Sequence, residues 1–331
     1  QYFDGIEMFE TAVETLRDRP STALLEALVM LGWFHVRFGK SEQAKALANE
    51  ALRLWQHEGV KVLAGFGSDA HTLISTTSLV QGDHEAALHW AKQAAHIAEQ
   101  RGDRFNLTIA HYNLCDAYIA KGEHDAAYYH AQQSVMLCRQ SGDRWFMAYC
   151  LNNLGQLMRI QGDYIAAREH YQESYRIREA FEDSEGMAVA LSNLGRIALL
   201  QERYEEAWPA LERSLNLYLA TGDQGGLLRV RCLLAEACTA FGDFDQACDY
   251  LRQALAATQQ LDATPHTLMV LAAIGALAVS VTMPDAGAVL LCFVVQHALV
   301  DRETSEQAQL MLKRARDMLP DAAYTACLLY T

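Results

Sequence analysis

A similar pattern of residues recurs about every forty positions along the chain. In each copy a Leu precedes a small residue, and a short turn, in most copies with Gly or Asp, follows about two helical turns later; the clearest copies begin at Leu114, Leu154, Leu194 and Leu234. A fixed period of this length is typical of stacked repeats, in which each unit buries its apolar face only against its neighbours. The repeat therefore predicts one elongated array, although a length of 331 residues would by itself suggest two globular domains.

Each copy predicts two antiparallel helices joined by a short turn. In residues 144–180, Leu151 and Leu154 share one face of a first helix. Gly162 can then adopt the left-handed conformation that ends a helix, and Asp163 can cap the next one. The repeating unit is therefore a helical hairpin.

Two columns of small residues indicate how the helices of a hairpin pack. The column on the second helices is Ala44, Ala87, Ala127, Ala167, Ala207 and Ala247, and the facing column on the first helices is Gly32, Ser75, Cys115, Gly155, Gly195, Ala235 and Gly275. A close helix crossing needs such positions, because the distance between helix axes depends on the side chains at the contact. The columns predict seven helical pairs, which start near residues 22, 62, 104, 144, 184, 224 and 264.

These columns also predict the organisation of the chain. Residues 21–300 form the array, residues 1–20 form an N-terminal helix that is the remnant of a preceding repeat, and residues 301–331 form a capping helix and a tail. The chain starts at Gln1 in an amphipathic pattern without an initiator Met, which predicts that it is a fragment.

The segments Leu-Asn-Asn-Leu-Gly at 151–155 and Leu-Ser-Asn-Leu-Gly at 191–195 resemble the tetratricopeptide repeat (TPR) in its forty-residue form. The resemblance covers about residues 22–300, and it implies an all-α fold: a right-handed superhelical α-solenoid of antiparallel helix pairs. Such arrays occur in the sensor regions of bacterial maltose-regulon-type activators. The tail at 312–328, which includes the segment 319–324, is similar to that of bacterial multidomain regulators with an upstream P-loop ATPase. The resemblance therefore implies the regulatory segment of a larger signalling ATPase or transcription regulator, with that ATPase domain as a partner in the parent chain.

Charge and composition exclude several classes of partner. The chain has 41 acidic and 27 basic side chains and a net charge of -14, which would repel a phosphate backbone, so direct nucleic-acid binding is not expected. The apolar runs are too short to span a bilayer, so no membrane is expected as a partner. Eight cysteines without paired spacing indicate reduced thiols and a cytoplasmic location.

The sequence contains no pattern that predicts catalysis. Gly39-Lys40-Ser41 is similar to the end of a phosphate-binding loop, but Phe34 stands where that loop needs an earlier Gly. No nucleophile is grouped with a base and an oxyanion donor, and the histidines replace aromatic residues in the repeat without forming a ligand set. We expect no enzyme, no metal site and no cofactor.

A candidate binding site lies on the stripe of each first helix that faces away from its partner helix, which in a curved stack lines the concave surface. Asn113, Asn153 and Asn193 occupy one column there and form a ladder of carboxamides. A carboxamide offers donors and an acceptor, so a row of them can pair with successive peptide groups of an extended ligand. In the TPR family, Asn in this column contacts bound peptide. The predicted site also includes Tyr112, Asn152, Asp116, Gln156, Arg196, Glu236, Tyr149, Arg229 and Arg159.

Several interpretations of this stripe stay open. Repeats that clamp a C-terminal carboxylate supply Lys beside the Asn, whereas Tyr112, Asn152 and Gln156 stand there, which argues against such a clamp. The Asn residues could instead hydrogen-bond across neighbouring repeats and set the superhelical twist. The ligand is a peptide or partner protein bound by a regulator, a peptide bound by a free-standing scaffold, or a small molecule in a pocket closed by Tyr149, Arg196 and Arg229.

Overall fold

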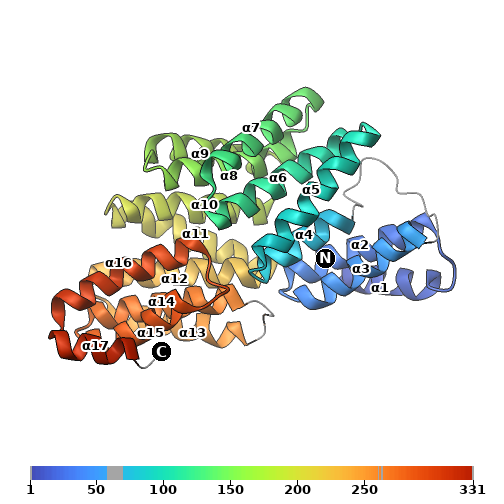
Figure 1. Ribbon diagram of the computed structural model, residues 1–331. Coiled ribbons are helices and arrows are strands. Elements are labelled where there is room, and N and C mark those ends of the chain that lie inside the picture. Colours follow the sequence, from blue (N-terminus) through green and yellow to red (C-terminus); the bar gives the residue numbers. More distant parts are fainter. Residues whose placement is uncertain (1, 58–69, 260, 262–263, 330–331) are drawn as a thin grey trace. The chain divides into compact units, whose positions relative to one another are not determined.

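The computed structural model describes residues 2–57, 70–259, 261 and 264–329 (Figure 1). Within these residues the regular structure is α-helical, without a strand. The chain divides into two compact units, unit 1 at Gln1–Gln161 and unit 2 at Gly162–Thr331. The expected all-α stack of helix pairs is confirmed.

Unit 1 contains helices α1 to α8. Their bounds are α1 Tyr2–Leu16, α2 Thr22–Arg37, α3 Ser41–His57, α4 Ala70–Val80, α5 His84–Arg101, α6 Arg104–Lys121, α7 His124–Ser141 and α8 Arg144–Ile160. Helices α2 and α3, α4 and α5, and α6 and α7 pack as successive pairs. The predicted pair start near residue 62 lies outside the described residues.

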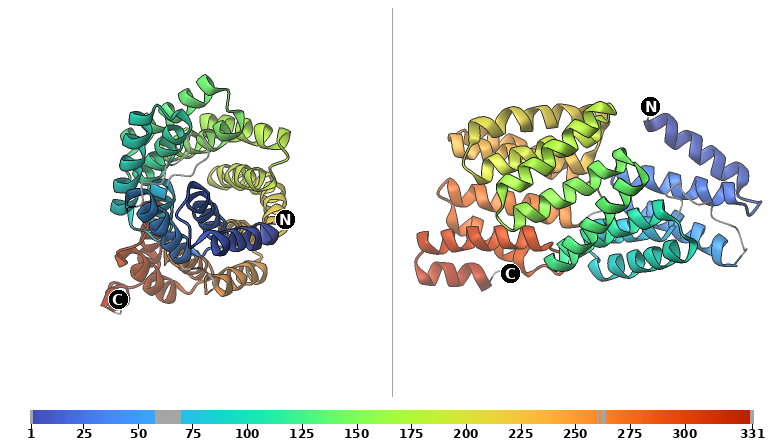
Figure 2. Two further views of the ribbon diagram at one scale, coloured as in Figure 1. Left: turned by 90° about the vertical axis from the view of Figure 1, so that its right-hand side faces the viewer. Right: turned by 90° about the horizontal axis from the view of Figure 1, so that it is seen from above.

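Unit 2 contains helices α9 to α17. Their bounds are α9 Tyr164–Ala180, α10 Ser184–Leu200, α11 Tyr204–Thr221, α12 Gln224–Phe241, α13 Phe244–Thr258, α14 Thr264–Ser280, α15 Pro284–Gln296, α16 Arg302–Met318 and α17 Asp321–Leu329. The segment after residue 300 contains two helices rather than one, because Pro320 follows the end of α16 and cannot continue it. Helices α16 and α17 lie side by side (Figure 2). The boundary between the two units falls between α8 and α9, inside the copy with the clearest repeat pattern.

The short turns form as the sequence predicts. The N-cap side chains of Asp83, Asp103, Asp143, Asp163, Asp183, Asp223 and Asp243 each accept a hydrogen bond from the backbone N–H three residues later. Before most of these caps a Gly has positive φ, for example 79° at Gly242. The equivalent position in the last pair is Thr282, with φ 67°, a conformation that costs a β-branched residue free energy.

The small columns bring the two helices of a pair into close contact. A Cβ atom added to Gly195 would lie 3.5 Å from the backbone oxygen of Ala207 and 2.5 Å from Leu211 Cδ2. At the corresponding site of another pair, the Ser75 hydroxyl donates a hydrogen bond of 2.8 Å to the Ala87 carbonyl. The Ala column is fully buried at Ala44, Ala87, Ala127, Ala167, Ala207 and Ala247. The predicted close crossing is therefore confirmed.

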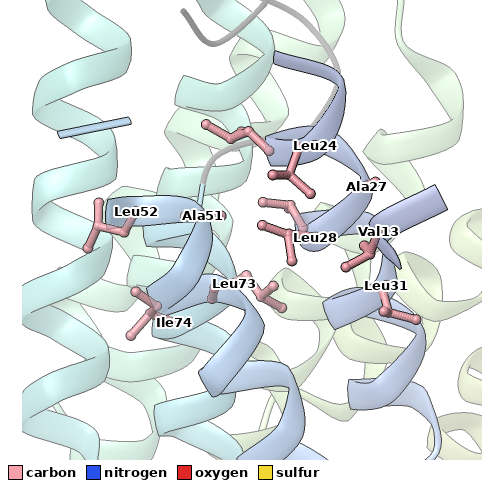
Figure 3. Packing of buried hydrophobic residues seen from close by; sticks show 13 residues of the cluster. Val13, Leu24, Ala27, Leu28, Leu31, Ala51, Leu52, Leu73 and Ile74 are labelled. Carbon is pink, nitrogen blue, oxygen red and sulfur yellow. The ribbon is translucent and has the colours of Figure 1, made fainter. Parts of the chain in front are cut away.

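Each unit has apolar cores that join successive helices. In unit 1, Leu28 of α2 and Leu73 of α4 are both 0% exposed, and Val13 of α1 lies near Leu31 of α2 (Figure 3). Truncating a buried Leu of this kind to Ala costs about 2–5 kcal/mol. No described helix has the combination of length and apolar character that crossing a bilayer requires.

We predict that Thr282→Gly stabilises the protein. Gly adopts a positive φ without the steric cost that Thr incurs, so the free energy of unfolding should rise by about 1 kcal/mol. Gly242→Thr, the reverse change at the equivalent turn, should lower it by a similar amount. Urea unfolding of the two variants and the wild type measures both effects; equal shifts of the same sign would contradict the prediction.

Candidate functional site

Helices α6 and α8 of unit 1 present an aromatic cluster, which consists of Tyr112, Trp145, Phe146 and Tyr149. The Tyr112 ring lies edge-on to Phe146 and Tyr149, with centroid distances of 5.7 and 6.1 Å, and Trp145 lies edge-on to Tyr149 at 5.1 Å. Phe146 is buried, whereas Trp145 is 41% exposed. The cluster therefore extends from the core to the surface, as aromatic anchors of a binding site do.

The Tyr112 hydroxyl is tied to a carboxylate on its own helix. Tyr112 donates a hydrogen bond to Asp116, one turn later on α6. Burial, with the negative charge of Asp116, raises the pKa of Tyr112 well above its ordinary value. Tyr112 therefore stays protonated at neutral pH and holds the Asp116 side chain at the surface of α6.

Asn113 hydrogen-bonds to the first helix of the preceding pair. Its carboxamide is 6% exposed, and Nδ2 donates to the backbone oxygen of Thr72 at 3.1 Å and to Thr76 Oγ1 at 3.3 Å, both on α4. At this position the carboxamide joins neighbouring repeats, which is the alternative that the sequence left open.

Asn152 and Asn153 on α8 have unsatisfied polar atoms. Asn153 is 5% exposed, and its buried Nδ2 has no nitrogen or oxygen acceptor, although the Cys115 thiol, a weak acceptor, lies within reach of this carboxamide. Oδ1 of Asn152 is likewise buried without a donor. An unsatisfied buried polar atom costs about 1–3 kcal/mol, so native structures rarely keep one without a reason. The pair offers one donor and one acceptor. Gln156 and Arg159 lie partly exposed further along α8.

In unit 2 the predicted residues lie on α10 and α12. Asn193 and Arg196 are partly exposed on α10, and Arg229 and Glu236 lie on α12. Arg196 forms an ion pair with Glu303, which lies in the first turn of α16. We refer to Arg196, Arg229, Glu236 and Glu303 as the charged cluster. Asn193 belongs to unit 2 and the other two ladder residues to unit 1, so a continuous ladder stays a prediction.

The ionisable groups around the charged cluster are shifted toward their neutral forms. Burial, with the positive charge of Arg229, lowers the pKa of His266 to about 4, and burial, with the charge of Glu236, raises the pKa of Cys232 to about 12. Glu236 is exposed, yet the surrounding chain limits its hydration enough to raise the pKa of its carboxyl against the opposing effect of Arg196.

Sequence reasoning missed Glu303, His266 and the role of Phe146. Glu303 lies beyond the array, so no column contains it, and nothing in the sequence pairs it with Arg196. Phe146 is an ordinary apolar residue in the pattern. The position of His266 in the degenerate last pair was the one available signal.

The histidines and cysteines have structural surroundings. The Nδ1 atoms of His111 and His130 lie 2.9 Å apart, and the His130 ring stacks on Tyr118 with a centroid distance of 5.5 Å. All eight cysteines are free thiols. Within the part of the chain that the structure describes, no three His, Cys, Asp or Glu side chains are grouped to hold a metal ion.

We predict that Asn113→Ala destabilises the protein more than Asn153→Ala. Both changes remove the same atoms from buried sites, but Asn113 loses hydrogen bonds to two oxygen atoms, whereas Asn153 loses only a contact with the weakly accepting Cys115 thiol. The free energy of unfolding should differ by about 1 kcal/mol between the variants. Urea unfolding measures this difference, and equal stabilities would show that the two carboxamides are equivalent.

We predict that part of the loss of stability in acid depends on His266. The folded chain binds this proton only near pH 4, whereas the unfolded chain binds it near the ordinary value of about 6.5. Because the unfolded state holds more protons between these values, stability falls as the pH drops from about 6.5 to 4. Urea midpoints at several pH values should decline less steeply in His266→Gln than in the wild type or in His89→Gln, which changes an exposed residue. Identical slopes would contradict the assignment.

The family profile described as tetratricopeptide repeat matches residues 106–180 and 181–278, which together make up more than half of the chain. A second profile, anaphase-promoting complex subunit 5, matches residues 1–63. No curated protein matches the chain in sequence.

Several solved structures share the fold. A Rap protein complexed with competence and sporulation factor has a TM-score of 0.62 at 14% identity, covering 98% of this chain and 87% of its own. Aspartyl phosphate phosphatase F from Bacillus subtilis has a TM-score of 0.61 at 15% identity, covering 92% of each chain. The Rap conjugation gene regulator of plasmid pLS20, in complex with the Phr* peptide, has a TM-score of 0.62 at 12% identity, covering 90% of this chain and 76% of its own. At these identities the similarity shows a common fold.

Proposed function

The chain belongs to the tetratricopeptide repeat family, and we propose that it binds an extended peptide segment of a partner protein on the first helices α6 and α8 of unit 1. Binding, rather than catalysis, is the activity that we assign to it. The observation that carries the proposal is the pair of unsatisfied carboxamide atoms at Asn152 and Asn153 beside the aromatic cluster.

A residue of an extended ligand complements these two carboxamides, because its own N–H and C=O point to the same side of the chain. Once the carboxamides turn toward the ligand, its C=O can accept from Asn153 Nδ2 and its N–H can donate to Asn152 Oδ1. This pairing does not depend on the ligand's side chains. Trp145, exposed two helical turns earlier on α8, then provides apolar area for a ligand residue further along the peptide.

The similar structures support the same class of ligand. The names of two of them specify a complex, one of a Rap protein with competence and sporulation factor and one of a Rap regulator with the Phr* peptide. Their fold is shared with this chain, and peptide binding by the array is the corresponding proposal here.

We propose in addition that the array is the regulatory segment of a larger bacterial signalling ATPase or transcription regulator of the maltose-regulon-activator type, located in the cytoplasm. The resemblance of residues 312–328 to the tails of such regulators supports this point, and the eight free thiols fit a reducing compartment. Reading the coding sequence upstream of Gln1 tests it. A P-loop ATPase module there is the expected result; without one, the free-standing peptide-binding scaffold is the better interpretation.

We predict that Asn152→Ala and Asn153→Ala each weaken peptide binding about tenfold, because each removes one hydrogen bond to the ligand backbone. The probe is an immobilised library of random nonapeptides. In each member one position, the fixed position, carries a chosen amino acid. Gln132→Ala, which removes an exposed carboxamide from the second helix α7, is the matched control and should bind like the wild type. Unchanged binding by both Asn variants would refute the site.

A further inference from the structure

Glu303 forms its ion pair with Arg196 from a helix that is firmly held in place. The Asp301 side chain caps α16 by accepting from the Thr304 N–H at 2.9 Å and from the Thr304 hydroxyl at 2.7 Å. Further along, Ala308, Leu312 and Ala315 are buried in the apolar core that α16 shares with α14 and α15 (Figure 1). The helix therefore holds Glu303 in place at the Arg196 guanidinium of α10.

This contact shows which ligand group the site accepts. The Arg196 side chain is only 16% exposed, and a poorly hydrated guanidinium needs a charged partner. The carboxylate that satisfies it comes from a segment far along the chain, and the Glu303 side chain remains 29% exposed. A carboxylate is thus the anion that fits Arg196, and the partly exposed Glu303 carboxylate can turn away into solvent.

We propose that unit 2 binds an Asp or Glu side chain of an extended peptide at Arg196, and that Glu303 competes with this ligand for the same guanidinium. The proposal rests on the proposed function and adds the class of residue that the peptide carries. In this exchange one carboxylate replaces another, so Arg196 is never left without a partner.

The released Glu303 keeps a favourable environment. It lies in the first turn of α16, where the positive end of the helix dipole stabilises a carboxylate by about 0.3–1 kcal/mol. The Thr304 and Asp301 hydrogen bonds do not involve it, so the helix cap persists when the side chain turns to solvent.

The charges of the cluster favour a carboxylate over a phosphate group. The charge of Arg196 also acts on Glu236. A ligand carboxylate replaces the single negative charge of Glu303, whereas a phosphate dianion would bring an additional negative charge close to Glu236 at a poorly hydrated guanidinium.

The test uses the same nonapeptide library, with Asp, Glu, Asn, Gln or Lys at the fixed position. The wild type should retain Asp and Glu members more strongly than the Asn and Gln members. Arg196→Gln should reduce this preference about fivefold while retaining peptides, and Glu303→Gln should raise retention of the acidic members about fivefold without changing the amide members.

Matched controls separate the contact from net charge. Glu306→Gln removes a negative charge from α16 whose partner is Arg302 on the same helix, and Arg213→Gln removes a positive charge that lies over the Tyr175 ring on a neighbouring helix. Both should leave the acidic preference unchanged. If Glu303→Gln does not fold, as judged by thermal unfolding, Glu303→Asp withdraws the carboxylate from Arg196 and should have the same effect.

The outcomes distinguish this inference from the proposed function. Peptide retention without an acidic preference, or an acidic preference that survives Arg196→Gln, overturns the inference and leaves peptide binding intact. Weaker retention of acidic peptides by Glu303→Gln also overturns it, because Glu303 would then help to bind the ligand. No retention by any variant overturns the proposed function and this inference together.

Discussion

Each helix pair depends on a close approach between two backbones at the small columns. Gly195 lies against the Ala207 carbonyl because neither residue has a side chain that separates the helices. At Ser75 the side chain is just large enough to use that proximity for a hydrogen bond to the Ala87 carbonyl. Since this contact fixes the geometry within a pair, it leaves the outward stripe of the first helix free to vary.

The column of Asn residues on the first helices illustrates this variation between repeats. Asn113 and Asn153 occupy the same place in successive repeats, and both are buried. The first bonds to Thr72 and Thr76 on α4, the first helix of the preceding pair, whereas the nitrogen of the second has no nitrogen or oxygen acceptor. One residue type at one position therefore joins neighbouring repeats in one copy, and in the next copy it is the residue that we propose for ligand binding.

The repeating contacts were predictable from the sequence because each of them leaves a period. The Asp caps, the Gly turns and the small columns recur, and the helices form where those signals place them. Features that occur once produce no repeating pattern in the sequence. They are the positive φ of Thr282, the boundary after Gln161 and the ion pair of Glu303 with Arg196, and each depends on tertiary geometry. The candidate residues were predictable as a stripe, but their partners were not.

The same reasoning indicates where specificity resides in an array of this kind. Residues that obey the period must satisfy the same packing in every copy, so they carry little information about a particular ligand. Arg196 and Glu303 are not repeated, and their contact joins the array to the segment that follows it. An ion pair that is poorly hydrated contributes little net stability when compared with apolar packing. In the exchange that we propose its role is selection, because a guanidinium that must keep a carboxylate admits only a ligand that brings one.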